Sequence, residues 1–302
     1  MRIVLGLDDS PHSHDAVEFL RKLPWAQREP WDIVSAVHLP IAAHATPGPA
    51  SVGPAIEAAE AETRRQELWL AETERGLREL GLDTRTTLAE ADARTALVDA
   101  ARTHVADLLV VGSRGHSGIR RLLLGSVAQH VAVHAPCSVL VVRPAAGRPD
   151  FDRRPMKVVV GIDESPCSRA AVDFVEPLDW PERVHFEVVA AVPPASDSLG
   201  VADGLHVGFE SSIVAQSRIR REIAMRYERR LRDAGYLVSS QAPLGDPREE
   251  ILRVIAETGA DLLVVGSHGR TGLSKLLLGS VSSYAVGHAS CSVLVVKPPR
   301  RV

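Results

Sequence analysis

Short apolar runs alternate with longer amphipathic segments along the whole chain. Three of the runs are uninterrupted, at 2–7, 107–112 and 138–143, and predict strands that are buried on both faces of a sheet. Further strands are predicted over 31–39 and over 83–89, where polar and apolar residues alternate as in an edge strand. Helices are predicted from Pro11 to about Leu23 and over 55–80, 94–104 and 126–134, with a loop over 40–54.

The same order of elements occurs twice. The segment "MRIVLGLDDSPHSHDAVEFL" (1–20) aligns with "MKVVVGIDESPCSRAAVDFV" (156–175), and 105–142 aligns with 259–296 without a gap, with 24 of 38 positions identical. Such similarity indicates two copies of one domain, each large enough to carry its own core. The segment 144–155, rich in proline and charge, predicts an exposed linker. We therefore expect two domains, 1–145 and 155–302.

Strands that alternate with helices predict parallel pairing through right-handed crossovers. Each half is thus expected to be a five-stranded, doubly wound α/β domain. Ligands of such sheets bind at the carboxyl ends of the strands, where the strand order reverses. The loops after the first and the fourth strand of each half are therefore the expected functional loops.

Composition excludes several classes of function. The 302 residues are 45% hydrophobic and 24% charged, which is typical of a globular protein, and the net charge of −3 gives no sign of a nucleic-acid partner. Three cysteines without metal-like spacing favour a reducing compartment. The N-terminus predicts a first strand and not a signal peptide, and no apolar run approaches the length of a membrane helix. We expect a cytoplasmic protein without a membrane partner.

Two glycine-spaced loops follow the apolar fourth strands. The first, "GSRGHSGIRRLLLGS", starts at Gly112, and the second, "GSHGRTGLSKLLLGS", starts at Gly266. Glycines let backbone N–H groups converge on an anion, and the last glycine and serine of each loop would open a helix, whose N-terminus attracts phosphate. The alternative is that the glycines only form a tight connection. No lysine follows the last glycine, so the loop is not a P-loop.

These loops, together with "VLGLDDSPHS" and "CSVLVV", resemble the nucleotide-binding members of the universal stress protein family, and the resemblance covers nearly the whole chain. It implies the strand order 3-2-1-4-5, ATP as the ligand, with or without Mg²⁺, and one site per domain. The implied site residues are the same in kind in both halves. They are Gly6, Asp8, Val37, Gly112, Ser113, Arg114, Gly115, Ser117, Gly118, Gly125, Ser126 and Val127, and then Gly161, Asp163, Val192, Gly266, Ser267, His268, Gly269, Thr271, Gly272, Gly279, Ser280 and Val281.

The resemblance implies a nucleotide-responsive stress or signalling module, and the residues leave alternatives open. Asp8 and Asp163 also suit a helix cap or a turn. A slow ATPase, a nucleotidyltransferase or a phosphotransferase would need a base or metal ligands, for which only Asp9 and Glu164 offer themselves. An ATP pyrophosphatase or an electron-transfer flavoprotein has a related sheet, but the S-G-G-x-D-S loop of the former is absent. No catalytic residue and no metal site are predicted.

The remaining candidates favour structural roles. We expect His134 and His288 to be structural, and Cys137 and Cys291 to be small core residues, while Cys167 at a helix start leaves a redox role open. The fifth strand of each half would be an apolar edge, which favours pairing of the two halves as an intramolecular pseudo-dimer and also allows a homodimer.

The two long helices carry apolar stripes with spacings that favour burial. The expected core positions are Trp69, Leu77 and Leu80 in the first helix and Ile219, Ile223, Tyr227 and Leu231 in the second. The charged run over 217–233 interleaves both signs, which is typical of a solvated helix face and not of a nucleic-acid site.

Overall fold

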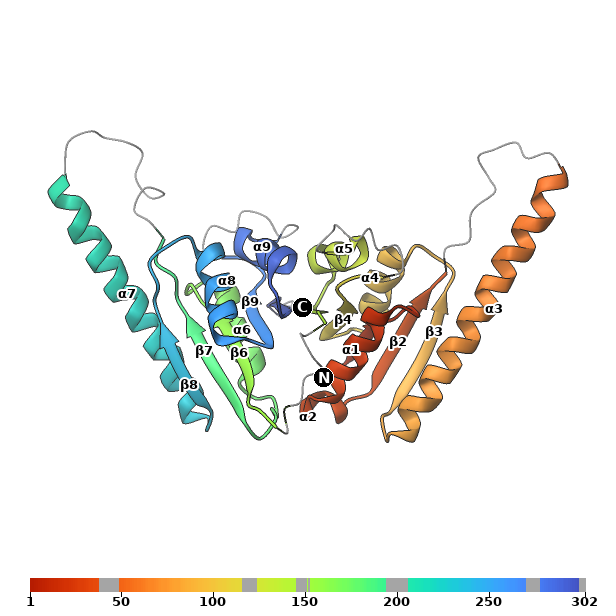
Figure 1. Cartoon of the computed structure of the whole chain (residues 1–302), viewed down its shortest axis with the longest axis horizontal. Coiled ribbons are helices and arrows are strands. Elements are labelled where there is room, and N and C mark those ends of the chain that lie inside the picture. Colours follow the sequence, from red (N-terminus) through yellow and green to blue (C-terminus); the bar gives the residue numbers. More distant parts are fainter. Residues whose placement is uncertain are drawn as a thin grey trace.

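The structure is a computed structural model of the whole chain. It describes residues 1–37, 49–115, 124–144, 151, 153–193, 206–269 and 278–298, and within 49–56 and 206–213 it describes the backbone alone. The predicted alternation of strands and helices is confirmed in both halves (Figure 1).

Each half contains five strands in the predicted order. The first half consists of β1 (Ile3–Gly6), α1 (Pro11–Arg21), α2 (Pro24–Gln27), β2 (Trp31–Ala36), α3 (Pro49–Glu79), β3 (Thr84–Ala89), α4 (Ala93–Thr103), β4 (Leu108–Gly112), α5 (Ser126–His134) and β5 (Ser138–Val142). The second consists of β6 (Met156–Gly161), α6 (Pro166–Val175), β7 (Val184–Val189), α7 (His206–Asp233), β8 (Leu237–Gln241), α8 (Pro247–Thr258), β9 (Leu262–Gly266), α9 (Ser280–His288) and β10 (Ser292–Val296).

Two elements differ from the prediction. The helix α3 begins at Pro49, so the loop expected over 40–54 is wrong for its last residues. Proline is common at the first helical position, where its missing N–H would have had no partner in the helix. The short helix α2, which also opens with a proline, was not predicted because a single turn leaves no periodic pattern.

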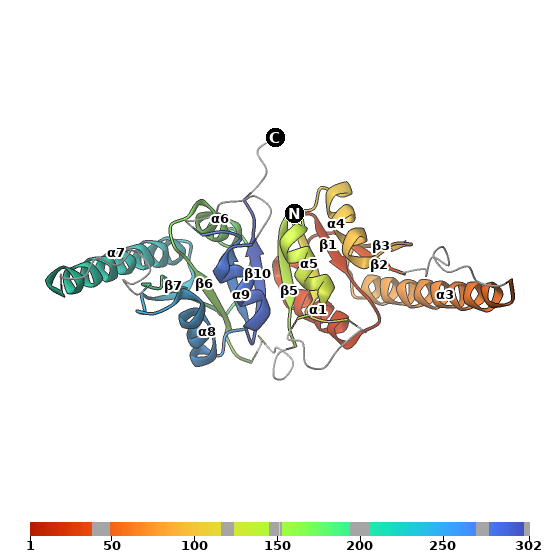
Figure 2. The same ribbon diagram turned by 90° about the horizontal axis from the view of Figure 1, so that it is seen from above.

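All ten strands form one sheet in the order β3-β2-β1-β4-β5-β10-β9-β6-β7-β8. The order 3-2-1-4-5 is therefore confirmed in both halves, and the strands within each half are parallel. The halves meet through antiparallel pairing of β5 with β10, in which Leu140 lies opposite Leu294 (Figure 2). This confirms the intramolecular pseudo-dimer. The junction strands β5 and β10 therefore run in opposite directions.

Alternate side chains of each strand enter two different cores. In β5, for example, Leu140 and Val142 face the core under α1, α3, α6 and α7, whereas Val139 and Val141 face the core under α4, α5, α8 and α9. Each core continues across the β5–β10 junction into the other half. The two halves are thus joined by shared apolar burial on both faces of one sheet.

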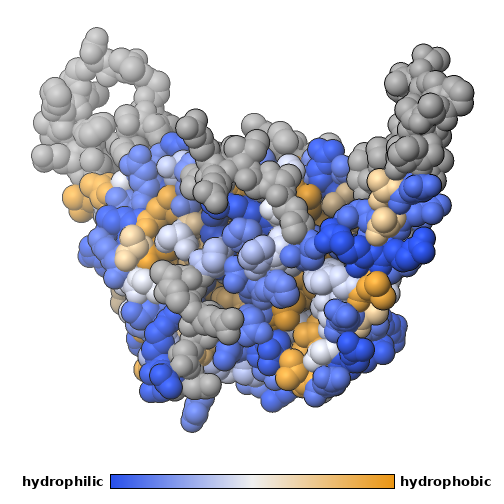
Figure 3. All heavy atoms as spheres, turned by 45° about the vertical axis from the view of Figure 1, so that its right-hand side comes forward, coloured by the Kyte–Doolittle hydropathy of each residue, from blue (hydrophilic) through white to orange (hydrophobic). Residues whose placement is uncertain are grey.

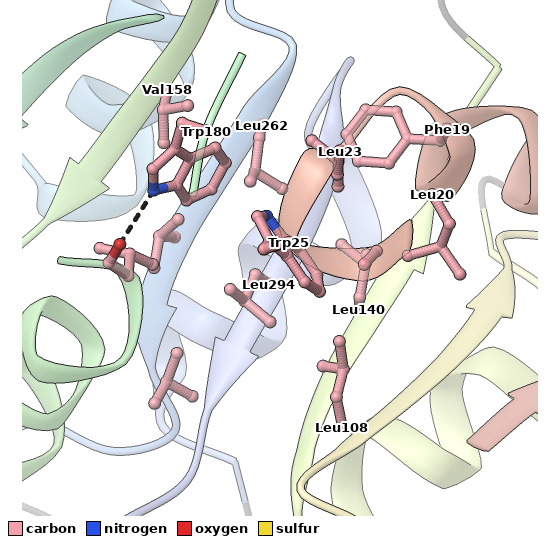
Figure 4. Close-up of a cluster of buried hydrophobic side chains, with 14 of the residues drawn as sticks. Phe19, Leu20, Leu23, Trp25, Leu108, Leu140, Val158, Trp180, Leu262 and Leu294 are labelled. Carbon is pink, nitrogen blue, oxygen red and sulfur yellow. Dashed lines mark hydrogen bonds between the residues drawn. The ribbon is translucent and has the colours of Figure 1, made fainter. Parts of the chain in front are cut away.

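Aromatic side chains close the junction beneath the sheet (Figure 4). Trp25 of α2 meets Trp180 of the second half edge to face, with ring centroids 6.4 Å apart, and its backbone N–H donates to the Asp179 carbonyl at 3.1 Å. Phe151, in the segment expected to be an exposed linker, is buried and packs edge to face on Phe19. The expectation of an exposed segment is wrong at Phe151. The free energy gained by burying a large aromatic side chain exceeds what the polar residues around it lose.

Each half also supplies a cation to a helix of the other half. The Lys297 ammonium, just after β10, donates to the carbonyls of Val133 (3.1 Å) and Ala135 (2.7 Å) at the end of α5. The Arg143 guanidinium, just after β5, donates to the Val286 carbonyl of α9 at 2.5 Å. These cations satisfy carbonyls that lack partners at a helix C-terminus, where the helix dipole also favours positive charge.

The surface is mostly hydrophilic, with apolar residues in scattered small groups (Figure 3). Burial of Leu77, Ile223, Tyr227 and Leu231 is confirmed, and Trp69 is partly buried, but Leu80 and Ile219 are more than half exposed. Leu80 follows the last residue of α3, beyond the packed part of the helix. Next to Ile219, Arg220 takes the inward position of that turn and is 6% exposed. Among the described residues, no helix has the length and apolar character that spanning a bilayer requires.

We expect Leu294→Ala to lower the free energy of unfolding by about 2–5 kcal/mol, since it removes a buried leucine from the junction strand. Leu80→Ala, at a position with 56% of the side chain exposed, is the control and should change it by about 0.5 kcal/mol or less. Urea denaturation measures both, and equal losses would contradict the shared core.

Candidate functional site

The candidate site of the first half lies at the carboxyl ends of β1 and β4, which are neighbours in the sheet. From β1 the chain enters α1 on one face of the sheet, whereas from β4 it leads to α5 on the other face. The strand order therefore reverses between β1 and β4, which is the place where open α/β sheets bind their ligands. The ends of β6 and β9 repeat this arrangement in the second half.

The acid after β1 organises the start of α1. The Oδ1 atom of Asp8 accepts hydrogen bonds from the Ser10 backbone N–H (3.2 Å), from the Ser13 hydroxyl (2.7 Å) and from the Ser10 hydroxyl. Asp163 likewise accepts from the Ser165 N–H at 3.0 Å. The turn interpretation of these acids is thus correct for one carboxylate oxygen, while the helix cap itself is Ser10 or Ser165.

The other carboxylate oxygen faces the glycine loop. A Cβ atom on Gly115 would lie 2.6 Å from Oδ2 of Asp8, and one on Gly269 would lie 2.8 Å from Oδ2 of Asp163. Both distances are too short for a side chain, so each glycine allows the loop backbone to approach the carboxylate closely. The structure thereby brings together the acid and the second loop glycine, which the sequence placed far apart.

The first and last loop glycines have packing roles. A Cβ on Gly112 would lie 2.6 Å from the His12 carbonyl oxygen, so β4 passes directly against the backbone of α1. Gly266 approaches the backbone of Cys167 in the same way. The Gly125 N–H donates to the Ser113 carbonyl at 2.8 Å, and Gly279 donates to Ser267 at the same distance. Each loop is therefore tied together at its base, independent of any ligand.

The helices that follow the loops start without a side-chain cap. Side-chain oxygens of Ser10, Asp92, Ser165 and Asp246 cap α1, α4, α6 and α8. At α5 and α9 the cap residue is a glycine, and no side-chain cap is present among the described residues. Ser126 and Ser280 are the first helical residues of α5 and α9, as expected of the serines that open these helices. Within the described residues, the first N–H groups of these helices have no side-chain acceptor, and such groups attract an anion.

Side chains with ring or guanidinium nitrogens stand beside the loops, although they differ between the halves. Arg114 and His268 occupy equivalent loop positions, and the buried Nε of Arg114 and Nε2 of His268 have no hydrogen-bond partner within the described residues. Burial and the positive charge of Arg114 lower the pKa of the nearby Arg143. The first loop thus carries an arginine whose buried N–H points to no protein acceptor in this part of the chain.

The other predicted contacts are partly explained by packing. The N–H of Val37 donates to the Ala89 carbonyl (2.9 Å) and that of Val192 to the Pro243 carbonyl (2.7 Å), so neither N–H is available to a ligand. A Cβ on Gly6 would lie 2.8 Å from the Leu97 side chain, which by itself explains a glycine there. Gly161 meets Ile251 and Val265 in the same way, and the backbones of Val127 and Val281 belong to the first turns of α5 and α9. Ser117, Gly118, Thr271 and Gly272 lie outside the described residues.

The acids considered for metal binding are paired with arginines. Asp9 forms an ion pair with Arg65 of α3, and Glu164 forms one with Arg226 of α7 at 2.7 Å. Among the described residues no cluster of three or more His, Cys, Asp or Glu side chains could hold a metal ion.

One difference between the sites was not predicted from the sequence. Gln66 of α3 and Arg220 of α7 stand at the same distance in sequence before Gly81 and Gly235, the glycines after their helices. Gln66 donates to the Ser35 hydroxyl at 2.9 Å, whereas the Arg220 guanidinium donates to the Asp163 backbone carbonyl at 3.3 Å. The second site therefore has a buried cation beneath its acid, and only the charged run that contained Arg220 could have signalled it.

Cys137, Cys291 and His288 agree with the sequence analysis. Burial raises the pKa of Cys137 to about 11 and that of Cys291 to about 12, which fits inert core residues. Cys167 is partly buried, with its sulfur 3.7 Å from the Ser267 hydroxyl oxygen. His288 Nδ1 lies 2.9 Å from the Tyr284 carbonyl oxygen, which is a structural contact.

Comparison with known proteins places these features in a family. The model of the universal stress protein family matches residues 1–143 and again 155–297. A universal stress protein of Mycolicibacterium smegmatis is 29% identical over 226 residues, which is 72% of this chain and 70% of that protein. Related proteins of Mycobacterium tuberculosis and Mycobacterium bovis are 32% identical over 200 residues, or 62% of their own length.

Solved structures show the same fold over the whole chain. A universal stress protein from Archaeoglobus fulgidus covers 98% of this chain and 96% of its own, with a TM-score of 0.63 and 19% identity. A family protein of Arabidopsis thaliana, solved with AMP bound, covers 48% of this chain and 93% of its own at 20% identity, with a TM-score of 0.34. That likeness is too slight to place a ligand here.

We expect Gly112→Ala to lower the free energy of unfolding by about 1–3 kcal/mol, because the new methyl group meets the backbone of α1, which cannot rotate away. The matched control is Gly76→Ala inside α3, where a Cβ meets no atom within 4 Å. That change should raise the free energy by about 0.5–1 kcal/mol. Urea denaturation that shows the same sign for both would contradict the close approach of β4 and α1.

Proposed function

Because the chain belongs to the universal stress protein family, we propose that it is an ATP-binding module with one nucleotide site in each of the domains 1–145 and 155–302. On this proposal, ATP in the clefts alters the shape or the partners of the protein during stress or signalling. The glycine-loop pattern of the family's nucleotide-binding members is complete in both halves.

One observation carries the proposal. The two helices that follow the glycine loops begin with uncapped N–H groups, while the other helices of eight or more residues whose starts are fully described have side-chain caps. A phosphate group is the ligand that such a helix start favours. On this proposal the nucleoside lies between Asp8 and Val37, as the family resemblance implies.

A binding module fits these residues better than an enzyme does. Phosphoryl transfer needs a positioned base or carboxylates that hold Mg²⁺. The acids next to the strand-one position are neutralised by Arg65 and Arg226. Cytoplasmic location and the absence of nucleic-acid partners stay predictions from composition. A homodimer would need a surface other than β5, since β5 is already paired with β10.

We expect Gly115→Val to abolish ATP binding in the first site and Gly269→Val in the second, because each side chain would occupy the space against the strand-one carboxylate. Isothermal titration calorimetry should give two ATP molecules per chain for the wild type, one for each single variant and none for the double variant. Gly76→Ala is the control and should keep both sites.

Two results would contradict the proposal. Full ATP binding by the double variant, with an unchanged unfolding transition, would make the loops mere connectors. Steady hydrolysis of ATP with Mg²⁺, lost on replacing Asp8 and Asp163 with asparagine, would instead support the slow ATPase or phosphotransferase.

Exchanging Gln66 and Arg220 should change the ATP affinities of the two sites in opposite directions. A positive charge ~10 Å from a negative charge of the nucleotide contributes about 1.5 kcal/mol to binding at an effective dielectric constant of ~20. This corresponds to a roughly tenfold change in affinity. We therefore expect Arg220→Gln to weaken ATP binding roughly tenfold at the second site and Gln66→Arg to strengthen it at the first. Calorimetry on chains in which Gly115→Val or Gly269→Val has removed the other site measures each effect. If Arg220→Gln and Gln66→Arg leave the ATP affinities of their sites unchanged, Arg220 has a purely structural role.

A further inference from the structure

Two histidines lie one helical turn apart on the outer part of α5. The ring centroids of His130 and His134 are 4.3 Å apart, and the ring planes are inclined by 38°. His130 is partly buried and His134 is exposed in the last turn. From the sequence, His134 was expected to be structural. His130, at the i−4 position, changes that expectation because side chains at i and i+4 share one helix face.

Charged groups of α4 lie near the pair. Burial, and then the neighbouring His134, lower the pKa of His130. From α4, the Asp92 carboxylate and the Arg94 guanidinium act on His130 with opposite signs. These two groups also bind each other, with Nε–Oδ1 and Nη2–Oδ2 distances of 2.9 and 3.0 Å.

We propose that His130 and His134 form a two-imidazole site for a late first-row divalent ion such as Ni²⁺, Cu²⁺ or Zn²⁺. Imidazole nitrogen is a preferred ligand of these ions. An ion ~2.0–2.1 Å from each ring needs nitrogens roughly 3 Å apart, which ring rotation reaches at the observed separation. Because no third protein ligand completes a cluster within the described residues, water fills the remaining positions and the ion exchanges readily. The site does not depend on nucleotide binding.

The second half contains the same framework without the second imidazole. In α9 the equivalent residues are Tyr284 and His288, whose rings stack with centroids 4.1 Å apart. Arg248, the counterpart of Arg94, lies over the Tyr284 ring at 5.8 Å and binds Asp246 as Arg94 binds Asp92. The chain therefore provides two helices at equivalent places in the repeat, of which α5 offers two imidazoles and α9 offers one.

Reciprocal exchange of the differing residue tests the site. The full chain, without a polyhistidine tag, is titrated with Ni²⁺ at pH 7.5 in a weakly coordinating buffer, and calorimetry gives the stoichiometry. We expect one equivalent for the wild type, none for His130→Tyr, which copies α9, and two for Tyr284→His, which copies α5. If His130→Tyr does not fold, His134→Gln at the exposed position replaces it, with the same expected loss.

The outcomes separate clearly. Loss of the ion in the α5 variant together with a second equivalent in Tyr284→His supports the proposal. An ion retained by the α5 variant, a wild type that binds none, or a Tyr284→His variant that still binds one overturns it. Circular dichroism and the midpoint of thermal unfolding check that each variant keeps its fold.

Discussion

The pairing of β5 with β10 is the interaction on which the rest of this molecule depends. Each strand would otherwise be an apolar edge with unpaired N–H and C=O groups, which is an unstable arrangement in water. Their antiparallel pairing makes one sheet of ten strands and lets both cores run through the junction. Lys297 and Arg143 then fix each half to a helix of the other. Because the pairing is antiparallel, β4 and β9, which lead to the two candidate sites, run in opposite senses on either side of the junction.

At each site, small residues serve three separate physical needs. Gly112 lets a strand touch the backbone of α1, Gly115 lets the loop approach a carboxylate, and Gly125 tucks against the backbone of Arg114. Of these contacts, only that of Gly115 with the carboxylate points to a function, since the other two improve packing whether or not a ligand binds. The glycine pattern therefore reflects packing at some positions and a candidate ligand site at another. The structure shows which glycine has which role.

Duplication has kept the backbone framework while individual side chains have changed. The helix starts, the loop closures and the acid–glycine contacts occur in both halves with nearly equal distances. Around this framework, Gln66 stands for Arg220, Arg114 for His268 and His130 for Tyr284. Each exchange alters charge or ligand chemistry without disturbing the packing, because each position lies beside the common framework and not within it.

The sequence by itself determined the repeat, the strands and most helix boundaries, because hydrophobic periodicity and capping residues act over only a few positions. It also located the acids and glycines at the ends of the right strands, through the general rule for parallel sheets. Only the tertiary structure decided that Gly115 lies against Asp8, that arginines neutralise Asp9 and Glu164, and that Phe151 and Arg220 are buried. Those contacts join residues that are distant along the chain or depend on which face of a helix packs inward. No local pattern encodes them, since they arise when the sheet and its covering helices come together.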